Sequence, residues 1–349
     1  MAVSRSFVFT PDFTCFYFGS PNYEKKNNLW YFIRFIAYRD FYLRQFQIPE
    51  SNTVISVVLT TYNRKEKLEK TLKSLLDQKY SVNYEVIVID NGSSDGTTDY
   101  LKQLGKQFGN LKLLEHGMGN VGPAKARNLG VKQAKGEIVA FTDDDCIPPD
   151  DWLKKIKEAF DNNPEIASAG GYLEAAEQVL KSNIFAQYEQ YNEKRYNISD
   201  KPYFSTKRDE LPFQTNNIAY KKKDFEKLGG FDETFSFIAG EDGDLKERGL
   251  KKGMKFLYIP VKVTHIQDYN LKRFWRQSLF RGANILEYRK RHGMKVPLRW
   301  EIYLYYLLII LGLPILLIRH IKNPQLALVA LLAELGRNTG KLIPPNGLG

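Results

Sequence analysis

The chain has 349 residues, of which 43% are hydrophobic and 26% are charged. This balance is typical of a globular protein and excludes a disordered or collagen-like chain. The two cysteines, Cys15 and Cys146, are too few for a disulfide-stapled secreted fold and favour a reducing compartment. Lys and Arg number 51 against 40 Asp and Glu, and the resulting formal net charge of +11 favours anionic partners such as nucleotide phosphates, acidic lipids or nucleic acid.

Residues 1–50 form an aromatic-rich arm. Pro11 and Asp12 interrupt its first apolar run, so we expect no signal peptide there. Between Trp30 and Phe46, apolar and aromatic residues alternate with arginines in a pattern that is typical of an amphipathic helix. Such a helix would either pack on the main domain or lie on a membrane surface, and we favour packing.

From residue 54 onward, apolar runs alternate with segments of helical periodicity. The apolar runs predict buried strands over residues 54–60, 84–89, 111–114, 137–142 and 256–263. Leucines at helical spacing predict a helix over 66–77, and Pro123 suits the first turn of a helix that runs to about 135. Strands that alternate with helices predict an α/β fold with a mostly parallel sheet flanked by helices. Such sheets bind ligands beyond the carboxyl ends of their strands.

Three of the predicted strands end in clusters of polar residues. The first ends in Thr60-Thr61-Tyr62-Asn63-Arg64, the second in Asp90-Asn91-Gly92-Ser93, and the fourth in Asp143-Asp144-Asp145. One such cluster alone would be an ordinary turn. Because all three face one crevice in a parallel sheet, together they predict a binding site.

The acidic triplet at 143–145 has two explanations. Three consecutive carboxylates repel one another, and burying them without a cation would raise their pKa values and cost stability. A divalent cation such as Mg²⁺ or Mn²⁺ removes the conflict, since it prefers oxygen ligands and is usually shared with substrate phosphates. The alternative is an acidic, solvated loop before the helix at Trp152, and the triplet alone does not separate the two explanations.

Other candidate groups are weaker when taken singly. No glycine-rich phosphate loop follows a strand, so a diphosphate would need a metal and basic groups such as Lys125 and Arg127, whose other role is a solvated helix face. Glu241 and Asp242 begin a helix, where they either complement the helix dipole or provide a general base. His265 follows a strand, and a single histidine is usually structural.

The order of these segments resembles the family 2 glycosyltransferases of GT-A fold. The resemblance covers about residues 53–270 and rests on Val57–Arg64, Val88–Gly96, Ala126–Gly130, Phe141–Asp145, Gly229–Asp232, Gly240–Asp242 and His265. It implies a Rossmann-like GT-A domain over 51–270. It also implies an inverting, metal-dependent transfer of a sugar from a nucleotide-diphosphate sugar to a hydroxyl acceptor.

The resemblance also implies a role for each matching residue. The nucleotide-sugar-binding positions are Thr60, Tyr62, Arg64, Asp90, Asn91, Arg127 and Asp144. The metal ligands for Mg²⁺ or Mn²⁺ are Asp143, Asp145 and His265. The catalytic base is Asp242, with Glu241 beside it. Asn91 stands where many members carry a second acid, so the preference for a particular base stays open.

Residues 271–349 differ in composition from the predicted catalytic domain. Residues 271–299 are basic with interspersed aromatics, which suits nucleic acid, a membrane surface or a lid over diphosphate, and we expect no nucleic acid partner. Apolar stretches follow at 302–318 and 326–335. We expect 300–335 to be membrane-associated, as a hairpin or one spanning helix, because Tyr303, Tyr305 and Tyr306 resemble interface anchors. The alternative is a hydrophobic helix packed on the catalytic domain.

These expectations converge on an enzyme at the cytoplasmic face of a membrane, where nucleotide sugars are made. Its acceptor would be a glycan or a lipid-linked molecule in surface polysaccharide or glycolipid synthesis. One alternative is a sugar nucleotidyltransferase, but the glycine-rich loop expected of that class is missing between Thr60 and Lys65. The other is a non-catalytic nucleotide-sugar-binding protein, against which the intact set of acids argues.

Overall fold

A computed structural model describes residues 8–9, 15–16, 55–79, 83–193, 196, 198–208, 210–212, 214–235, 240–266, 269–312 and 324–342. The chain divides into two compact units, Met1–Glu50 and Ser51–Gly349. In the first unit, strands β1 (Val8–Phe9) and β2 (Cys15–Phe16) pair antiparallel. The amphipathic helix expected between Trp30 and Phe46 lies outside the described residues.

The second unit is built on a nine-stranded mixed sheet. Its strands are β3 (Ile55–Thr61), β4 (Tyr84–Asp90), β5 (Leu111–Glu115), β6 (Ile138–Phe141), β7 (Cys146–Ile147), β8 (Ile166–Ala175), β9 (Tyr203–Ser205), β10 (Ile218–Lys221) and β11 (Lys255–His265). The order is β5-β4-β3-β6-β10-β8-β11-β7, and β9 also pairs with β11. Neighbours from β5 to β6 are parallel, as are β8 and β11, whereas β10, β7 and β9 run antiparallel to their partners. The predicted α/β class is confirmed, but the sheet is mixed, because four of the eight strand pairings in the described ranges are parallel and four are antiparallel.

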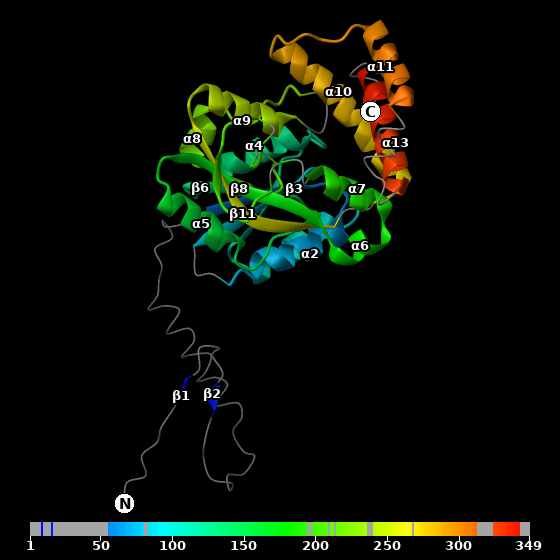
Figure 1. The fold of residues 1–349 in the computed structure, drawn as a ribbon. Helices are drawn as coiled ribbons and strands as arrows, with labels where there is room; N and C mark the ends of the chain where they lie inside the picture. The colour runs from blue at the N-terminus through cyan, green and yellow to red at the C-terminus, as the bar shows by residue number, and fades with distance from the viewer. Residues whose placement is uncertain are drawn as a thin grey trace, which may run out of the picture. The chain divides into compact units, whose positions relative to one another are not determined.

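Helices cover both faces of this sheet (Figure 1). One hydrophobic core packs under α2 (Lys65–Leu76), α3 (Thr97–Gln107) and α5 (Trp152–Asn162), and a second under α4 (Pro123–Gln133), α8 (Lys222–Lys227) and α9 (Glu241–Lys251). Strand β3 contributes Val57 and Leu59 to the first core and Val58 to the second. Successive side chains of a strand point to opposite faces, so a continuous apolar run is what a doubly covered strand requires.

The remaining helices form a separate packed group. They are α6 (Glu177–Ser182), α7 (Ile184–Glu193), α10 (Leu271–Arg291), α11 (Arg299–Leu311) and α13 (Pro324–Leu342). The pair α10 and α13 pack closely at two glycines: a Cβ at Gly282 would lie 1.9 Å from the carbonyl oxygen of Arg337, and one at Gly340 would lie 2.0 Å from that of Leu279. None of the helices in the described ranges combines the length and the apolarity that crossing a bilayer requires. The middle of the expected membrane hairpin, residues 313–323, lies outside those ranges.

The chain order of the strands changes direction next to β3. From β3 the chain continues to β4 and β5 on one side, and then returns to β6 on the other side of β3. In parallel sheets, ligands bind beyond the carboxyl ends of the strands at such a change of direction. The polar clusters that follow β3, β4 and β6 therefore lie together at the carboxyl ends of these strands.

Candidate active site

Each of the three acids between β6 and β7 lies next to a basic side chain. Arg127 Nη2 donates to Asp143 Oδ1 at 2.8 Å, and Arg64 Nη1 donates to Asp144 Oδ1 at 2.8 Å. His265 Nε2 lies 3.2 Å from Asp145 Oδ1. The partners come from α4, from the residue before α2 and from the end of β11. Segments that are distant in sequence therefore converge on the triplet.

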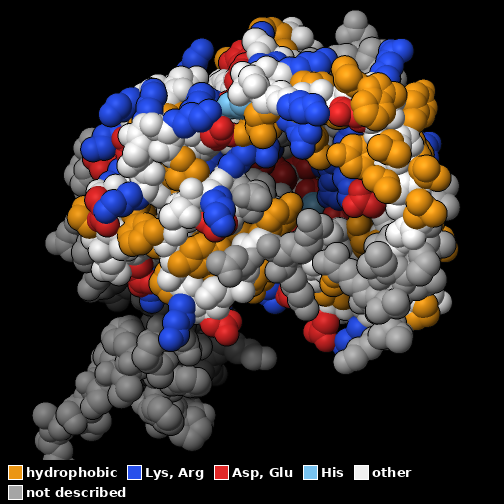
Figure 2. Space-filling model, turned by 45° about the horizontal axis from the view of Figure 1, so that its top comes forward, with side chains coloured by type: hydrophobic (Ala, Val, Ile, Leu, Met, Phe, Trp, Pro, Cys, Tyr) orange, Lys and Arg blue, Asp and Glu red, His pale blue; other side chains and the backbone are white. Residues whose placement is uncertain are grey.

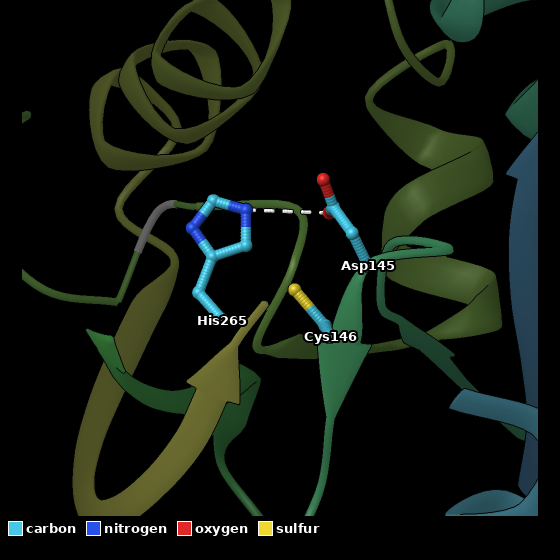
Figure 3. Close-up of side chains that lie close together, drawn as sticks. All are labelled: Asp145, Cys146 and His265. Carbon is cyan, nitrogen blue, oxygen red and sulfur yellow. Dashed lines mark ion pairs between the residues drawn. The ribbon is translucent and has the colours of Figure 1, made fainter. Parts of the chain in front are cut away.

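Strand pairing explains why His265 reaches Asp145. In the antiparallel pair of β7 and β11, His265 is opposite Cys146, and the Ile266 backbone N–H donates to the Asp145 carbonyl oxygen at 2.8 Å. Figure 3 shows the imidazole and the carboxylate facing each other beside the thiol. The ligating atoms of Asp145, Cys146 and His265 all lie within 4.8 Å of one another, so the three form a candidate metal site.

The chemistry of the donors favours two of these three groups as ligands. Burial raises the pKa of the Cys146 thiol, and a protonated thiol is a poor metal ligand. Burial alone would raise the pKa of Asp145, but the hydrogen bond from His265 and the charges of His265, Arg64 and Arg273 lower it. Asp145 therefore stays ionised, and its carboxylate with the His265 imidazole fits a divalent cation.

The central acid of the triplet points into the protein. Asp144 Oδ2 accepts a hydrogen bond from Thr61 Oγ1 at 2.8 Å, and its backbone carbonyl accepts one from Thr71 Oγ1 at 3.1 Å. Burial raises the pKa of Asp144 to about 6, although Arg64 opposes this rise. These contacts tie the acidic loop to β3 and α2, while the nucleotide-sugar role of Asp144 and Arg64 stays a prediction.

The acid pair at the start of α9 is joined to the triplet by one arginine. Besides Asp143, Arg127 donates through Nη1 to Glu241 Oε1 at 3.0 Å, and all three side chains are largely enclosed. Burial, and then the charge of Asp242, raises the pKa of Glu241 to about 7. Burial also raises the pKa of Asp242, although the Gly243 backbone N–H donates to Asp242 Oδ1 at 2.7 Å. Arg127 thus holds the two halves of the predicted site together.

Helix α10 and the loop after β9 bring two further cations to this site. Arg273 Nη2 lies 3.6 Å from Asp145 Oδ2. The guanidinium of Arg208 lies 3.6 Å from the centre of the Tyr288 ring, and it is so close to α9 that a Cβ at Gly243 would lie 2.9 Å from Arg208 Nε. Arg208 opposes the rise in the pKa of Asp242 that burial causes. Figure 2 shows acidic side chains inside a hollow that basic side chains surround.

The residues expected to bind the nucleotide lie at the ends of β3 and β4. Tyr62 is 44% exposed and follows Thr60 at the end of β3. Asp90 is buried and accepts hydrogen bonds from the Ser93 backbone N–H at 2.9 Å and from the Thr98 hydroxyl. The Asn91 amide donates to Asn120 at 2.9 Å and accepts from the Val121 backbone N–H at 3.1 Å. Asp90 and Asn91 therefore shape this loop, and their contact with a nucleotide stays a prediction.

Some residues of this site were not found from the sequence. Thr61 was seen only as part of the polar cluster after β3, and no motif in residues 201–214 pointed to Arg208. Arg273 belonged to the basic segment 271–299 without a role of its own. A basic residue reveals no partner by its identity, so only the fold could single these two out.

Family comparisons agree with this architecture. The sequence model of glycosyl transferase family 2 matches residues 56–229, and that of the N-terminal domain of galactosyltransferase matches residues 201–271. Together they include the acidic triplet, the acid pair at the start of α9 and His265. The chain belongs to glycosyl transferase family 2 and has its GT-A fold.

Curated relatives are similar over different lengths. Glycosyltransferase AglE of Haloferax volcanii is 39% identical over 102 residues, which is 29% of this chain and 33% of that protein. Chondroitin synthase of Escherichia coli is 26% identical over 238 residues, 61% of this chain and 34% of that protein. This chain therefore spans about a third of the length of these two relatives.

One further relative matches over most of its length, and one solved structure shares the fold. Dolichyl N-acetyl-alpha-D-glucosaminyl phosphate 3-beta-D-2,3-diacetamido-2,3-dideoxy-beta-D-glucuronosyltransferase of Methanococcus voltae is 24% identical over 239 residues, 66% of this chain and 72% of that protein. The mannosyltransferase PcManGT of Pyrobaculum calidifontis, solved with GDP-Man and Mn²⁺, superposes with a TM-score of 0.60 at 17% identity. That match covers 89% of this chain and 95% of the mannosyltransferase.

Proposed function

We propose that this chain is an inverting, metal-dependent glycosyltransferase that transfers a sugar from a nucleotide-diphosphate sugar to a hydroxyl acceptor. The observation that carries the proposal is the double contact of Arg127 with Asp143 and Glu241. It holds Asp143, which lies in the acidic triplet of the candidate metal site, beside Glu241, the neighbour of the candidate base Asp242. A single-displacement transferase needs a cation site and a base close to one another. Family membership and the Mn²⁺ and GDP-Man bound by the mannosyltransferase structure support the same assignment.

Asp145 and His265 would hold the cation, with Asp143 beside them, because their side chains supply the oxygen and nitrogen donors on this edge. A bound Mg²⁺ or Mn²⁺ neutralises negative charge on a departing nucleoside diphosphate. Arg64 and Arg273 lie next to Asp145 and are placed to meet the remaining phosphate charge. Thr60, Tyr62 and the loop at Asp90 would hold the nucleoside.

Asp242 is the proposed base. Its raised pKa makes it a better proton acceptor than an exposed carboxylate, while Arg208 limits the rise. Asp242 takes the proton of the acceptor hydroxyl, whose oxygen bonds to the anomeric carbon from the face opposite the diphosphate. The bond from that carbon to the diphosphate oxygen breaks with its electron pair on the leaving group. One displacement inverts the configuration, as in one-step inverting hydrolases, with an alcohol in place of water.

We further propose that the acceptor is a glycan or a lipid-linked molecule in surface polysaccharide or glycolipid synthesis, at the cytoplasmic face of a membrane. The relatives named as chondroitin synthase and as a transferase of a dolichyl phosphate-linked sugar support this class of acceptor. The basic and apolar composition of residues 271–335 supports the location.

The test is a panel of nucleotide sugars, with release of nucleoside diphosphate measured in the presence of Mn²⁺ or of a chelator. We expect turnover of at least one donor with Mn²⁺, and a loss of about a hundredfold or more in Asp145→Asn and in Asp242→Asn. Asp161→Asn, on the surface of α5, is the matched control and should keep full activity. Full turnover by both site variants would overturn the assignments.

A further inference from the structure

Helix α11 presents a broad apolar face to solvent. Trp300, Tyr303, Leu304, Leu307, Leu308 and Leu311 each expose 45–64% of their surface. With Met294, Leu298 and Tyr305, they make up nine of the sixteen exposed large hydrophobic residues in the described ranges. Figure 2 shows hydrophobic side chains gathered on the side of the molecule where Figure 1 places α11 and α13. A contiguous apolar patch of this kind is unusual on a soluble monomer and marks an interaction surface.

The opposite face of α11 is already packed on α13. Ile302 is buried, and the Tyr306 hydroxyl forms a hydrogen bond of 2.9 Å with the Thr339 hydroxyl of α13. These contacts fix which face of α11 points outward. The helix has 13 residues and is therefore about 20 Å long, and it lies along α13 with its apolar side exposed.

Positive charge flanks this face, while the face itself carries none. Lys290, Lys295 and Arg299 are exposed at and beyond the end of α10 and at the start of α11, although Lys295 also pairs with Glu301 of α11 at 3.2 Å. No charged residue occurs from Ile302 to Leu311. Aromatic residues at the edge of an apolar face with adjacent Lys and Arg are typical of helices that lie in a membrane interface.

We infer that α11 docks on an anionic lipid bilayer, lying in the plane of the interface with its apolar face in the acyl boundary and Lys290, Lys295 and Arg299 against lipid phosphates. This deepens the proposed function by naming the lipid surface and the helix that meets it. A second copy of the chain would cover the same apolar face but fits less well, because each copy carries a formal net charge of +11 and offers no excess of negative charge to the Lys and Arg beside that face. An anionic lipid surface neutralises these charges.

The docked helix is also connected to the site. Helix α10 carries Arg273, which lies next to Asp145, and Tyr288, which packs on Arg208, and it ends next to the basic flank of α11. Docking through α11 would therefore hold the candidate active site at a defined distance from the lipid surface. A lipid-linked acceptor is anchored in that surface.

The test is sedimentation of the full chain with vesicles of phosphatidylcholine alone or with about 30% phosphatidylglycerol. We expect binding to the anionic vesicles. Leu304→Ser/Leu307→Ser/Leu311→Ser should weaken it about tenfold or more, because apolar burial is lost. Lys290→Gln/Lys295→Gln/Arg299→Gln should weaken it by roughly a hundredfold, since each charge near an anionic surface contributes about a fivefold gain.

Matched controls carry equal changes elsewhere on the surface. Phe108→Ser/Met118→Ser/Phe204→Ser removes three other exposed hydrophobic residues, and Lys70→Gln/Lys106→Gln/Lys132→Gln removes three other exposed charges. Both should bind like the unaltered chain. As a measurement that needs no multiple variant, brominated lipids should quench tryptophan fluorescence in the unaltered chain and much less in Trp300→Phe.

The inference is overturned if the unaltered chain does not sediment with anionic vesicles, or if the α11 variants bind as well as it does. It is also overturned if the chain dimerises without lipid and the α11 variants abolish the dimer. Nucleotide release measured without vesicles keeps the two proposals apart. Lipid binding without any turnover would contradict only the proposed function, and turnover without lipid binding would contradict only the docking of α11.

Discussion

Replacing Arg127 by methionine tests the link between the acidic triplet and the start of α9. The Arg127 side chain is 6% exposed, and its guanidinium donates to Asp143 at 2.8 Å and to Glu241 at 3.0 Å. Methionine keeps much of the length and apolar volume but removes the charge. Glu241, which is 6% exposed, would be left buried without its cation.

The expected loss of stability follows from this geometry. Breaking a buried ion pair by removing one partner costs about 3–5 kcal/mol, because the other charge stays desolvated. The Asp143 side chain is 27% exposed and partly hydrated, so most of the cost comes from Glu241. We therefore expect Arg127→Met to lower the free energy of unfolding by about 3–4 kcal/mol when Glu241 is ionised.

The pH dependence of this loss has a definite sign. The pKa of Glu241 is raised from 4.5 to about 7 in the folded protein, so ionising it above that pH destabilises the fold, and Arg127 offsets part of the cost. Without Arg127 the pKa of Glu241 rises further. The deficit should therefore be small near pH 5.5, where Glu241 is protonated in both proteins. It should grow by about 1.4 kcal/mol per pH unit above pH 7, to about 2 kcal/mol near pH 8.5, and approach its full value only at still higher pH.

Urea unfolding at these two pH values measures the effect. Arg127→Met/Glu241→Gln should recover most of the loss, because no buried charge is left alone. Lys132→Met, an exposed change on the same helix, is the control and should stay within about 0.5 kcal/mol of the unaltered chain. An equal loss at both pH values, or a double variant no more stable than Arg127→Met, would refute the reasoning.

Three further predictions concern the cations and acids of the site. Asp145→Asn should weaken Mn²⁺ binding in calorimetry by at least about tenfold, and unchanged affinity would remove Asp145 from the metal site. Arg273→Ala should weaken binding of inorganic pyrophosphate with Mn²⁺ by roughly tenfold, with Arg273→Lys less affected, and equal affinity in all three proteins would contradict a phosphate role. Arg208→Ala should move the acid limb of the kcat/KM profile to higher pH, because the charge of Arg208 opposes the rise in the pKa of the proposed base Asp242. A limb that stays in place or moves to lower pH would show that Arg208 does not act on this proposed base.

Sequence patterns identified several of the elements, because each pattern reflects local burial. The apolar run at 54–60 predicted a strand covered on both faces, and β3 (Ile55–Thr61) contributes to both cores. The helix predicted over 66–77 is found at Lys65–Leu76. The period of the apolar residues shows which face of a helix or strand is buried. That face can therefore be predicted without knowing which other segments cover it.

The chemistry of the site was readable only in part. Acids at the carboxyl ends of parallel strands had to share one edge, so Asp90 and the triplet 143–145 could be placed there from the sequence. Which acid meets which cation could not be read, since any Arg or Lys is chemically able to pair with any of them. The apolar stretches over 300–335 have the same ambiguity. An apolar sequence alone does not show whether lipid or another part of the protein covers it.

The sequence by itself determined the α/β class, the family and the set of acids at the strand ends, because strand periodicity and motif order are local properties of the chain. Only the tertiary structure decided that Arg127 joins Asp143 to Glu241, that the pairing of β7 with β11 sets His265 against Asp145, and that α10 brings Arg273 to the site. Those contacts depend on the register between strands and on the rotation of helices about their axes. Both are set by packing between segments far apart in the chain, which no local pattern records.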